Sequence, residues 1–204
     1  MDADDVTRAV GLAIETLSEA EDRDWSVRAG DLTWTCWETT EHMADDLFMY
    51  ASQLSLAAPS VTAHVPYGYQ SRREGGPYLT VFVDPAQRPA GLLQVLESCG
   101  GLLAAVVATA PPERRSFHNY GPSDPSGFAA MGVVEVIVHM HDLAAGLGLT
   151  WEPPEDLCAR ALTRLFPEAP ADEDPWATLL WSTGRADRPG HPRPEKWKWD
   201  GSPR

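Results

Sequence analysis

Apolar side chains recur every three or four residues along much of the chain, and this spacing predicts amphipathic helices. The periodic stretches cover residues 4–21, 33–56, 87–109, 127–147, 155–166 and 176–183. In the first stretch the apolar positions are Val6, Val10, Ala13, Ile14 and Leu17. Thr33 could cap the second, because a hydroxyl at that position accepts a free backbone N–H. The pattern therefore predicts a mostly α-helical protein.

The segment between the second and third of these helices has a different pattern. Its four prolines and three glycines between residues 57 and 85 exclude a long helix. Residues 61–65 and 78–83 have strand-like compositions and could form a small hairpin. A connection of this length favours a functional loop or lid over a simple turn.

Four long helices with one long connection predict a four-helix bundle, to which the two short C-terminal helices are appended. We expect one domain over residues 1–184 and an extended or mobile tail over residues 185–204. Trp197 and Trp199 in this tail could dock it on the bundle.

Composition narrows the possible partners and locations. The 16 Lys and Arg residues against 30 Asp and Glu residues give a net charge of -14. This negative field disfavours nucleic acid and anionic membrane surfaces as partners. Without a continuous apolar run of about 18 residues, we expect no membrane span. The acidic N-terminus is unlike a signal peptide, and three distant cysteines predict no disulfide framework, so we expect a cytoplasmic protein.

The stretch 127–147 carries the most informative chemistry. It is apolar on nearly every side, which predicts a buried helix, yet it contains Glu135 and His139. Residues four apart lie on the same helix face, and a buried carboxylate is costly unless it is paired. Two compensations are open: a hydrogen bond to a protonated His139, or a metal ion bound by both side chains.

His42, in the middle of the second helix, is the candidate third ligand. Metal sites in helical bundles are built from inward-facing side chains on separate helices. Three protein ligands leave one position open for water or substrate, as in catalytic sites. A histidine on a helix is nevertheless more often a packing or surface residue than a ligand.

Residues next to these candidates have two readings each. Asp142, three residues after His139, could orient that histidine as a ligand, or it could simply cap polar groups near the helix end. Asp45 or Asp46 could act as a further metal ligand beside His42, but we expect both to be exposed to solvent. His118 and Tyr120 could line a pocket mouth, although an ordinary loop is the simpler expectation.

Two motifs resemble a known family. Trp37, His42 and Leu47 form W-x-x-x-x-H-x-x-x-x-L, and the segment from Glu135 to Leu143 forms E-V-x-V-H-x-x-D-L. Together they resemble the DinB-like bundle superfamily, and more closely the N-terminal domain of mycothiol-dependent maleylpyruvate isomerases. The segment L-W-S-T-G-R, ending at Arg185, is similar to actinobacterial relatives. The resemblance covers roughly residues 5–190 and is loose between residues 57 and 126.

The resemblance implies that His42, Glu135 and His139 bind a divalent metal ion, usually zinc. It also implies a low-molecular-weight thiol such as mycothiol as cosubstrate, activated on the metal. The isomerases carry a sizeable second domain, whereas 19 residues follow Arg185 here. This difference favours a thiol S-transferase over the isomerase.

The sequence thus predicts a metal-dependent enzyme that activates a small thiol for S-transfer to, or isomerisation of, a small electrophile. No catalytic residue is assigned beyond the metal ligands, and a homodimer is a weaker expectation. The alternative is a non-catalytic bundle that binds a small ligand or protein partner, with a structural or vestigial metal site.

Overall fold

The structure, a computed structural model, describes residues 1–170, 174–188 and 190–204. Its helices are α1 Ala3–Ser18, α2 Cys36–Ser55, the 3₁₀ helix η1 Pro85–Gln87, α3 Arg88–Thr109, α4 Pro125–Leu147, α5 Glu155–Leu165 and α6 Pro175–Ser182. No β-strand occurs among the described residues; backbone pairing outside the helices is limited to isolated bridges. The expectation of a mostly α-helical chain is confirmed.

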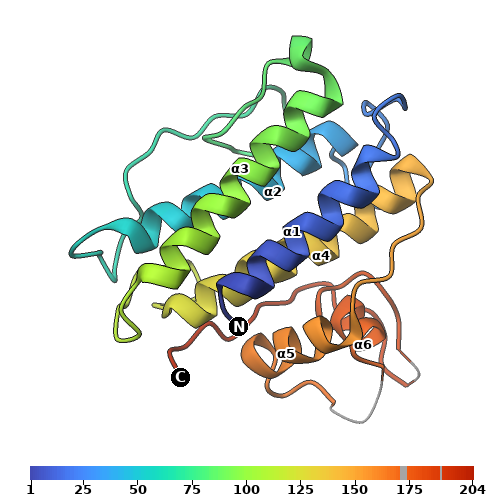
Figure 1. The fold of residues 1–204 in the computed structure, drawn as a ribbon. Helices are drawn as coiled ribbons and strands as arrows, with labels where there is room; N and C mark the ends of the chain where they lie inside the picture. The colour runs from blue at the N-terminus through green and yellow to red at the C-terminus, as the bar shows by residue number, and fades with distance from the viewer. Residues whose placement is uncertain (171–173, 189) are drawn as a thin grey trace.

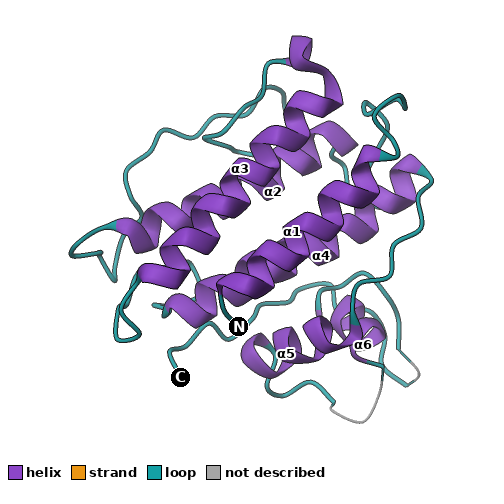
Figure 2. Cartoon of the chain, in the orientation of Figure 1, coloured by secondary structure: helices purple, strands orange, loops and turns teal. Residues whose placement is uncertain are grey.

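The four long helices run alongside one another, as Figure 1 shows. Helices α1 and α2 each pack against both α3 and α4, so the apolar faces of all four meet in one core. Helix α5 packs on α4 and α6, and the loops drawn in Figure 2 cover the sides and ends.

Side-chain caps set where the helices begin. Thr35 accepts a hydrogen bond from the Glu38 backbone N–H, and Glu38 accepts one from the Thr35 N–H. This reciprocal pair satisfies two backbone donors that a helix start leaves free. The expected cap at Thr33 is therefore wrong, because only Thr35 has a glutamate three residues later. Asp2 and Asp5 form the same arrangement at α1.

Helix α4 lies in the core, as its uniformly apolar sequence predicted. Gly132 allows this helix to approach its neighbours closely. A Cβ atom at that position would lie 2.6 Å from a Leu103 methyl group and 3.1 Å from one of Leu47. The side chains of α2 and α3 thus occupy space that any larger residue would need.

By length and composition alone, two segments of the described chain could cross a membrane: Pro85–Thr109 and Pro125–Leu147. The most apolar stretch is 83% buried within the protein for the second segment and 33% for the first. A buried core helix passes the same test, which accounts for α4. The expectation that no segment spans a membrane stays a prediction.

The connection between α2 and η1 does not form the expected hairpin. Gln70 and Leu79 form one isolated bridge, and the next backbone groups bond to α2 instead. The N–H groups of Thr80 and Val81 each donate to Asp45 over 2.7 Å. The Val83 N–H likewise donates to Glu41 over 2.8 Å. Buried carboxylates of α2 therefore take the place of a partner strand.

The described part of the segment 185–204 contains no helix or strand, and residue 189 lies outside the description. Trp199 in this segment is 4% exposed and belongs to the core. The Asp200 N–H donates to the Leu165 carbonyl, and the Ser123 hydroxyl donates to the Gly201 carbonyl. The segment is thus tied to α5 and to the start of α4. The expected boundary at residue 184 stays a prediction.

Candidate metal centre

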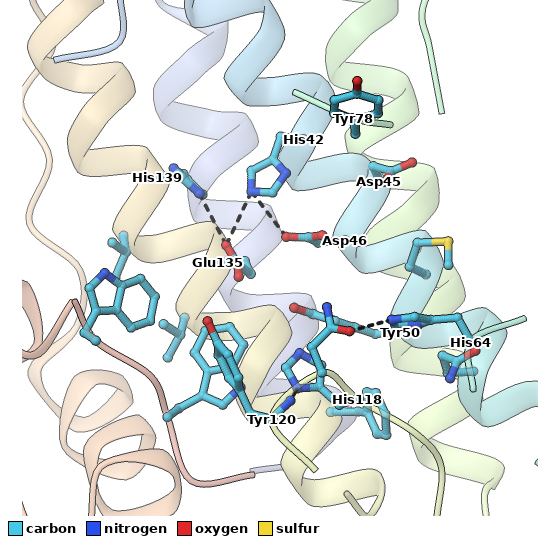
Figure 3. Close-up of a pocket in the computed structure, with 18 of the residues that line it drawn as sticks. His42, Asp45, Asp46, Tyr50, His64, Tyr78, His118, Tyr120, Glu135 and His139 are labelled. Atoms are coloured by element: carbon cyan, nitrogen blue, oxygen red, sulfur yellow. Dashed lines mark hydrogen bonds and ion pairs between the residues drawn. The ribbon is translucent and has the colours of Figure 1, made fainter. Parts of the chain in front are cut away.

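His42, Glu135 and His139 converge at the middle of the bundle, and Figure 3 shows their side chains pointing toward one another. His42 comes from α2, and the other two come from adjacent turns of α4. One ligand atom from each side chain lies within 4.8 Å of the other two. Glu135 Oε2 is 3.3 Å from His139 Nε2 and 3.9 Å from His42 Nε2.

A buried carboxylate fixes the orientation of His139. The Nδ1 atom of His139 lies 3.0 Å from Asp142 Oδ2. Because a carboxylate oxygen can only accept, the Nδ1–H group is the donor. Nε2 is therefore left facing Glu135. Arg185 Nη2 lies 2.9 Å from the same Asp142 oxygen. Asp142 and Arg185 therefore both lie on the Nδ1 side of the His139 ring. This is the arrangement that commonly supports a metal-bound histidine.

The three side chains differ in their protonation tendencies. Burial, reinforced by the charge of nearby His139, lowers the pKa of His42 to about 4, so this imidazole is neutral near pH 7. Burial also opposes ionisation of Glu135, but the hydrogen bond from His139 and the charges of both histidines outweigh it and lower its pKa. Burial lowers the His139 pKa as well, but hydrogen bonds to Asp142 and Glu135 prevail and raise it.

This donor set fits a divalent cation. Two imidazole nitrogens and one carboxylate oxygen are ordinary ligands for zinc and for related first-row metals. Their mutual distances of up to 4.8 Å would allow all three to contact one ion after small side-chain adjustments. The described residues could therefore hold a metal ion here.

Comparisons with protein-family models, with curated proteins and with solved structures give no match.

Asp46 is also part of the site, which corrects the expectation that it is solvent-exposed. Its side chain is 21% exposed, and Oδ2 lies 3.4 Å from His42 Nε2, four residues earlier on α2. Burial and the negative charges of Glu135 and Asp45 raise the pKa of Asp46 well above its usual value. Asp45 is not exposed either, because it is buried and binds the connection.

A cavity of about 690 Å³ opens beside the three candidate ligands. His42, Glu135 and His139 lie in its wall, together with Asp46 and Tyr50. Tyr50 is 7% exposed and shares the cavity wall with Glu135. Burial and the charges of Asp46 and Glu135 raise the pKa of Tyr50, so its hydroxyl stays protonated. A small molecule could therefore reach the triad from this cavity.

His118 and Tyr120 are the remaining sequence candidates. His118 and Tyr120 line the same cavity, which supports the pocket reading over the ordinary loop. Cys36, which lies on the same helix as His42, is buried, and burial raises the pKa of its thiol to about 11. His141 contacts Trp176 and is absent from the triad.

Sequence reasoning missed the roles of Arg185 and Tyr50. Tyr50 lies four residues after Asp46, which places both on one face of α2, and this spacing was the available signal. Arg185 lies more than 40 residues after its partner Asp142, and no local periodicity connects such distant positions.

Proposed function

We propose that this chain is a DinB-like, metal-dependent enzyme that activates a low-molecular-weight thiol for transfer to a small electrophile. The observation that carries the proposal is the convergence of His42, Glu135 and His139 beside a cavity of about 690 Å³. The sequence motifs that resemble mycothiol-dependent maleylpyruvate isomerases supply the thiol chemistry. Zinc is the proposed metal, because nitrogen and carboxylate donors suit it.

A bound divalent cation would stabilise the thiolate form of a thiol near neutral pH and so supply a nucleophile. The protein side chains prepare the site for this chemistry. Neutral His42 offers a lone pair, and the Nε2 atom of His139 would offer one once a bound cation displaces its proton, while Asp142 and Arg185 keep His139 in the required orientation. Three protein ligands would leave a coordination position for the thiol on the cavity side.

Thiol binding can be tested with the cobalt(II)-substituted protein. We expect addition of mycothiol, glutathione or cysteine to produce a sulfur-to-cobalt charge-transfer band in the near ultraviolet. His139→Ala should abolish the band, whereas His141→Ala should keep it, because His141 lies on the same helix outside the triad. A cobalt protein that binds no thiol would contradict the proposed function.

Asp46 gives a specific reason to consider a second function. Its Oδ2 lies 3.4 Å from His42 Nε2 and could supply a fourth protein ligand. A closed site with four ligands is typical of structural metals and would favour a non-catalytic bundle that binds a small ligand or a protein partner. X-ray absorption of the zinc protein distinguishes the two: loss of one oxygen ligand in Asp46→Asn supports the structural site.

Proposals on partners and location follow from the same function. Small-molecule thiols and electrophiles suit the size of the cavity. A cytoplasmic location would provide the reduced thiol, and a homodimer is compatible with the fold. Nucleic acid is disfavoured as a partner by the net charge of -14.

A further inference from the structure

Aromatic rings gather at the end of the cavity away from the triad. Figure 3 shows His118 and Tyr120 there, on the opposite side of Tyr50 from His42. The ring centre of His118 lies 5.3 Å from that of Tyr120 and 5.6 Å from that of Trp199. Tyr120 and Trp199 are themselves 5.8 Å apart. These three residues form what we call the aromatic end of the cavity.

Tyr50 connects the aromatic end to the metal centre. It shares the cavity wall with Glu135, and its ring centre is 6.0 Å from that of His118. All of these residues line the same cavity. One small molecule could therefore contact the aromatic end and still place an atom at the triad.

The aromatic end carries no formal charge. The His118 Nδ1 atom accepts a hydrogen bond from the Tyr120 backbone N–H, so its single proton is on Nε2. Burial lowers the pKa of His118 to about 4, and the ring is neutral near pH 7. It offers a hydrogen-bond donor but no positive charge.

The charged residues in the cavity wall are elsewhere. Among the described lining residues the acidic and arginine side chains are Asp45, Asp46, Glu135 and Arg185, and Arg185 is already paired with Asp142. A charged group at the aromatic end would lose its hydration without gaining a partner, which is unfavourable. An uncharged planar ring instead gains apolar burial and ring–ring contact there.

Tyr120 is half exposed, with 50% of its surface accessible, although it belongs to this ring cluster. An exposed aromatic side chain beside a cavity leaves a ring face free for a ligand. Tyr78 offers a comparison: it also lines the cavity and is 74% exposed, but Figure 3 shows it at the other end, near His42 and Asp45.

We infer that the cavity takes a substrate with an uncharged planar ring, which lies against Tyr120 and Trp199 while another atom of the molecule reaches the triad. This inference rests on the proposed function, because it names the class of electrophile for that site. It assigns His118 as a donor to a polar substituent on the ring.

Hydroxamic acids test the inference, because the hydroxamate group chelates zinc while the substituent attached to it can be varied. Their binding to the zinc-loaded protein is measured by calorimetry, without any need for turnover. We expect benzohydroxamic acid to bind about tenfold more tightly than acetohydroxamic acid, from ring burial and ring–ring contact. Cyclohexyl and para-carboxylated analogues should both bind more weakly than benzohydroxamic acid, since one is not planar and the other is charged.

Tyr120→Ala is the informative variant, since its exposed side chain can be removed without opening the core. We expect it to reduce the preference for benzohydroxamic over acetohydroxamic acid about fivefold. Tyr78→Ala, which removes an equally large exposed ring at the other end, should retain the preference. Equal binding of the phenyl and methyl compounds to the wild type, or an unchanged preference in Tyr120→Ala, would overturn the inference.

A second measurement separates this inference from the metal proposal. Binding of naphthol to metal-free protein is followed by ligand-observed NMR, and we expect it to weaken in Tyr120→Ala but not in Tyr78→Ala. If naphthol binds in this way while no hydroxamic acid binds, the ring-binding role of the aromatic end is supported and the proposed metal centre is contradicted. If all hydroxamic acids bind equally and naphthol does not bind, the proposed metal centre is supported and the ring-binding role of the aromatic end is contradicted.

Discussion

At the scale of single residues, the orientation of the His139 ring depends on Asp142 and Arg185. Asp142 accepts the hydrogen bond of Nδ1–H over 3.0 Å, and Arg185 holds the same carboxylate oxygen over 2.9 Å. The carboxylate fixes both the tautomer and the ring orientation, and it increases the basicity of Nε2. These two residues would therefore position His139 as a metal ligand without contacting the ion themselves.

We predict that Asp142→Asn weakens zinc binding about 10-fold to 100-fold, because the carboxylate no longer favours the donor tautomer at Nδ1. Competition with a chromophoric chelator measures the affinity, and circular dichroism checks that the fold is retained. Asp156→Asn is the control, since Asp156 pairs with Arg8 on the surface. Zinc affinity equal to that of the wild type in Asp142→Asn would contradict this role.

The sequence could predict the triad but not all of its surroundings. Glu135 and His139 are four residues apart on an apolar helix, so their shared face follows from helix geometry. Asp46 has the same spacing from His42, yet the expectation of exposure was wrong. Periodicity gives the face of a helix, but the neighbour covering that face is known only from tertiary packing.

At the scale of secondary-structure elements, Asp124 joins three parts of the chain. It caps α4 by accepting the Gly127 N–H over 2.7 Å, and it pairs with Arg164 of α5 over 2.9 Å. It also accepts the Arg204 N–H from the C-terminal segment over 2.8 Å. Both Asp124 and Arg164 are buried, so loss of one leaves the other without compensation.

We predict that Asp124→Ala lowers the free energy of unfolding by about 3 kcal/mol, from the lost cap and the unpaired Arg164. Asp2→Ala is the matched control at α1 and should lower it by about 1 kcal/mol, because Asp2 caps a helix without an arginine partner. Urea titration measures both. A loss of equal size in the two variants would contradict the buried pair.

The Asp124 contribution should depend on pH in a defined direction. Burial opposes ionisation, but hydrogen bonds from the Arg204 and Gly127 N–H groups and from Arg164 prevail and lower its pKa below 3.8. A carboxylate with a lowered folded-state pKa stabilises the protein above the unfolded-state pKa and loses this effect as the pH falls. The stability difference between wild type and Asp124→Ala should therefore be constant near neutrality and shrink below about pH 4. A difference that persists at lower pH would contradict this.

The positions of the helices were predictable because their apolar periodicity is local. The hairpin was not, because the alternative partner for residues 80–83 is distant in sequence. Val83 bonds to Glu41 and Thr80 to Asp45, so acidic side chains of α2 replace a strand. The strand-like composition of this segment therefore leads to no strand pairing beyond the single bridge between Gln70 and Leu79.

At the scale of the whole molecule, the C-terminal segment completes both the core and the cavity. Trp199 is buried among core residues and also lines the cavity beside the triad. Tryptophan at this position gives a sequence signal for docking, but the segment is held by distant residues: Ser123 bonds to Gly201, and Leu165 bonds to Asp200. Long-range contacts of this kind cannot be derived from local pattern.

We predict that Trp199→Ala lowers the free energy of unfolding by about 3 kcal/mol, because it removes a large buried side chain. Trp197→Ala should have a smaller effect, since Trp197 is only partly buried. Thermal denaturation compares the two variants, and limited proteolysis reports release of the segment. Equal stability of Trp199→Ala and wild type would show that this segment does not contribute to the fold.

We propose that His42, Glu135 and His139 hold one metal ion. Elemental analysis of protein purified without chelator and without added metal tests it most directly, with Glu135→Ala and the control His141→Ala prepared in parallel. We predict about one zinc ion per chain in wild type and His141→Ala, and loss of the metal in Glu135→Ala. Wild type without metal even after reconstitution, or Glu135→Ala that retains its metal, would contradict the account.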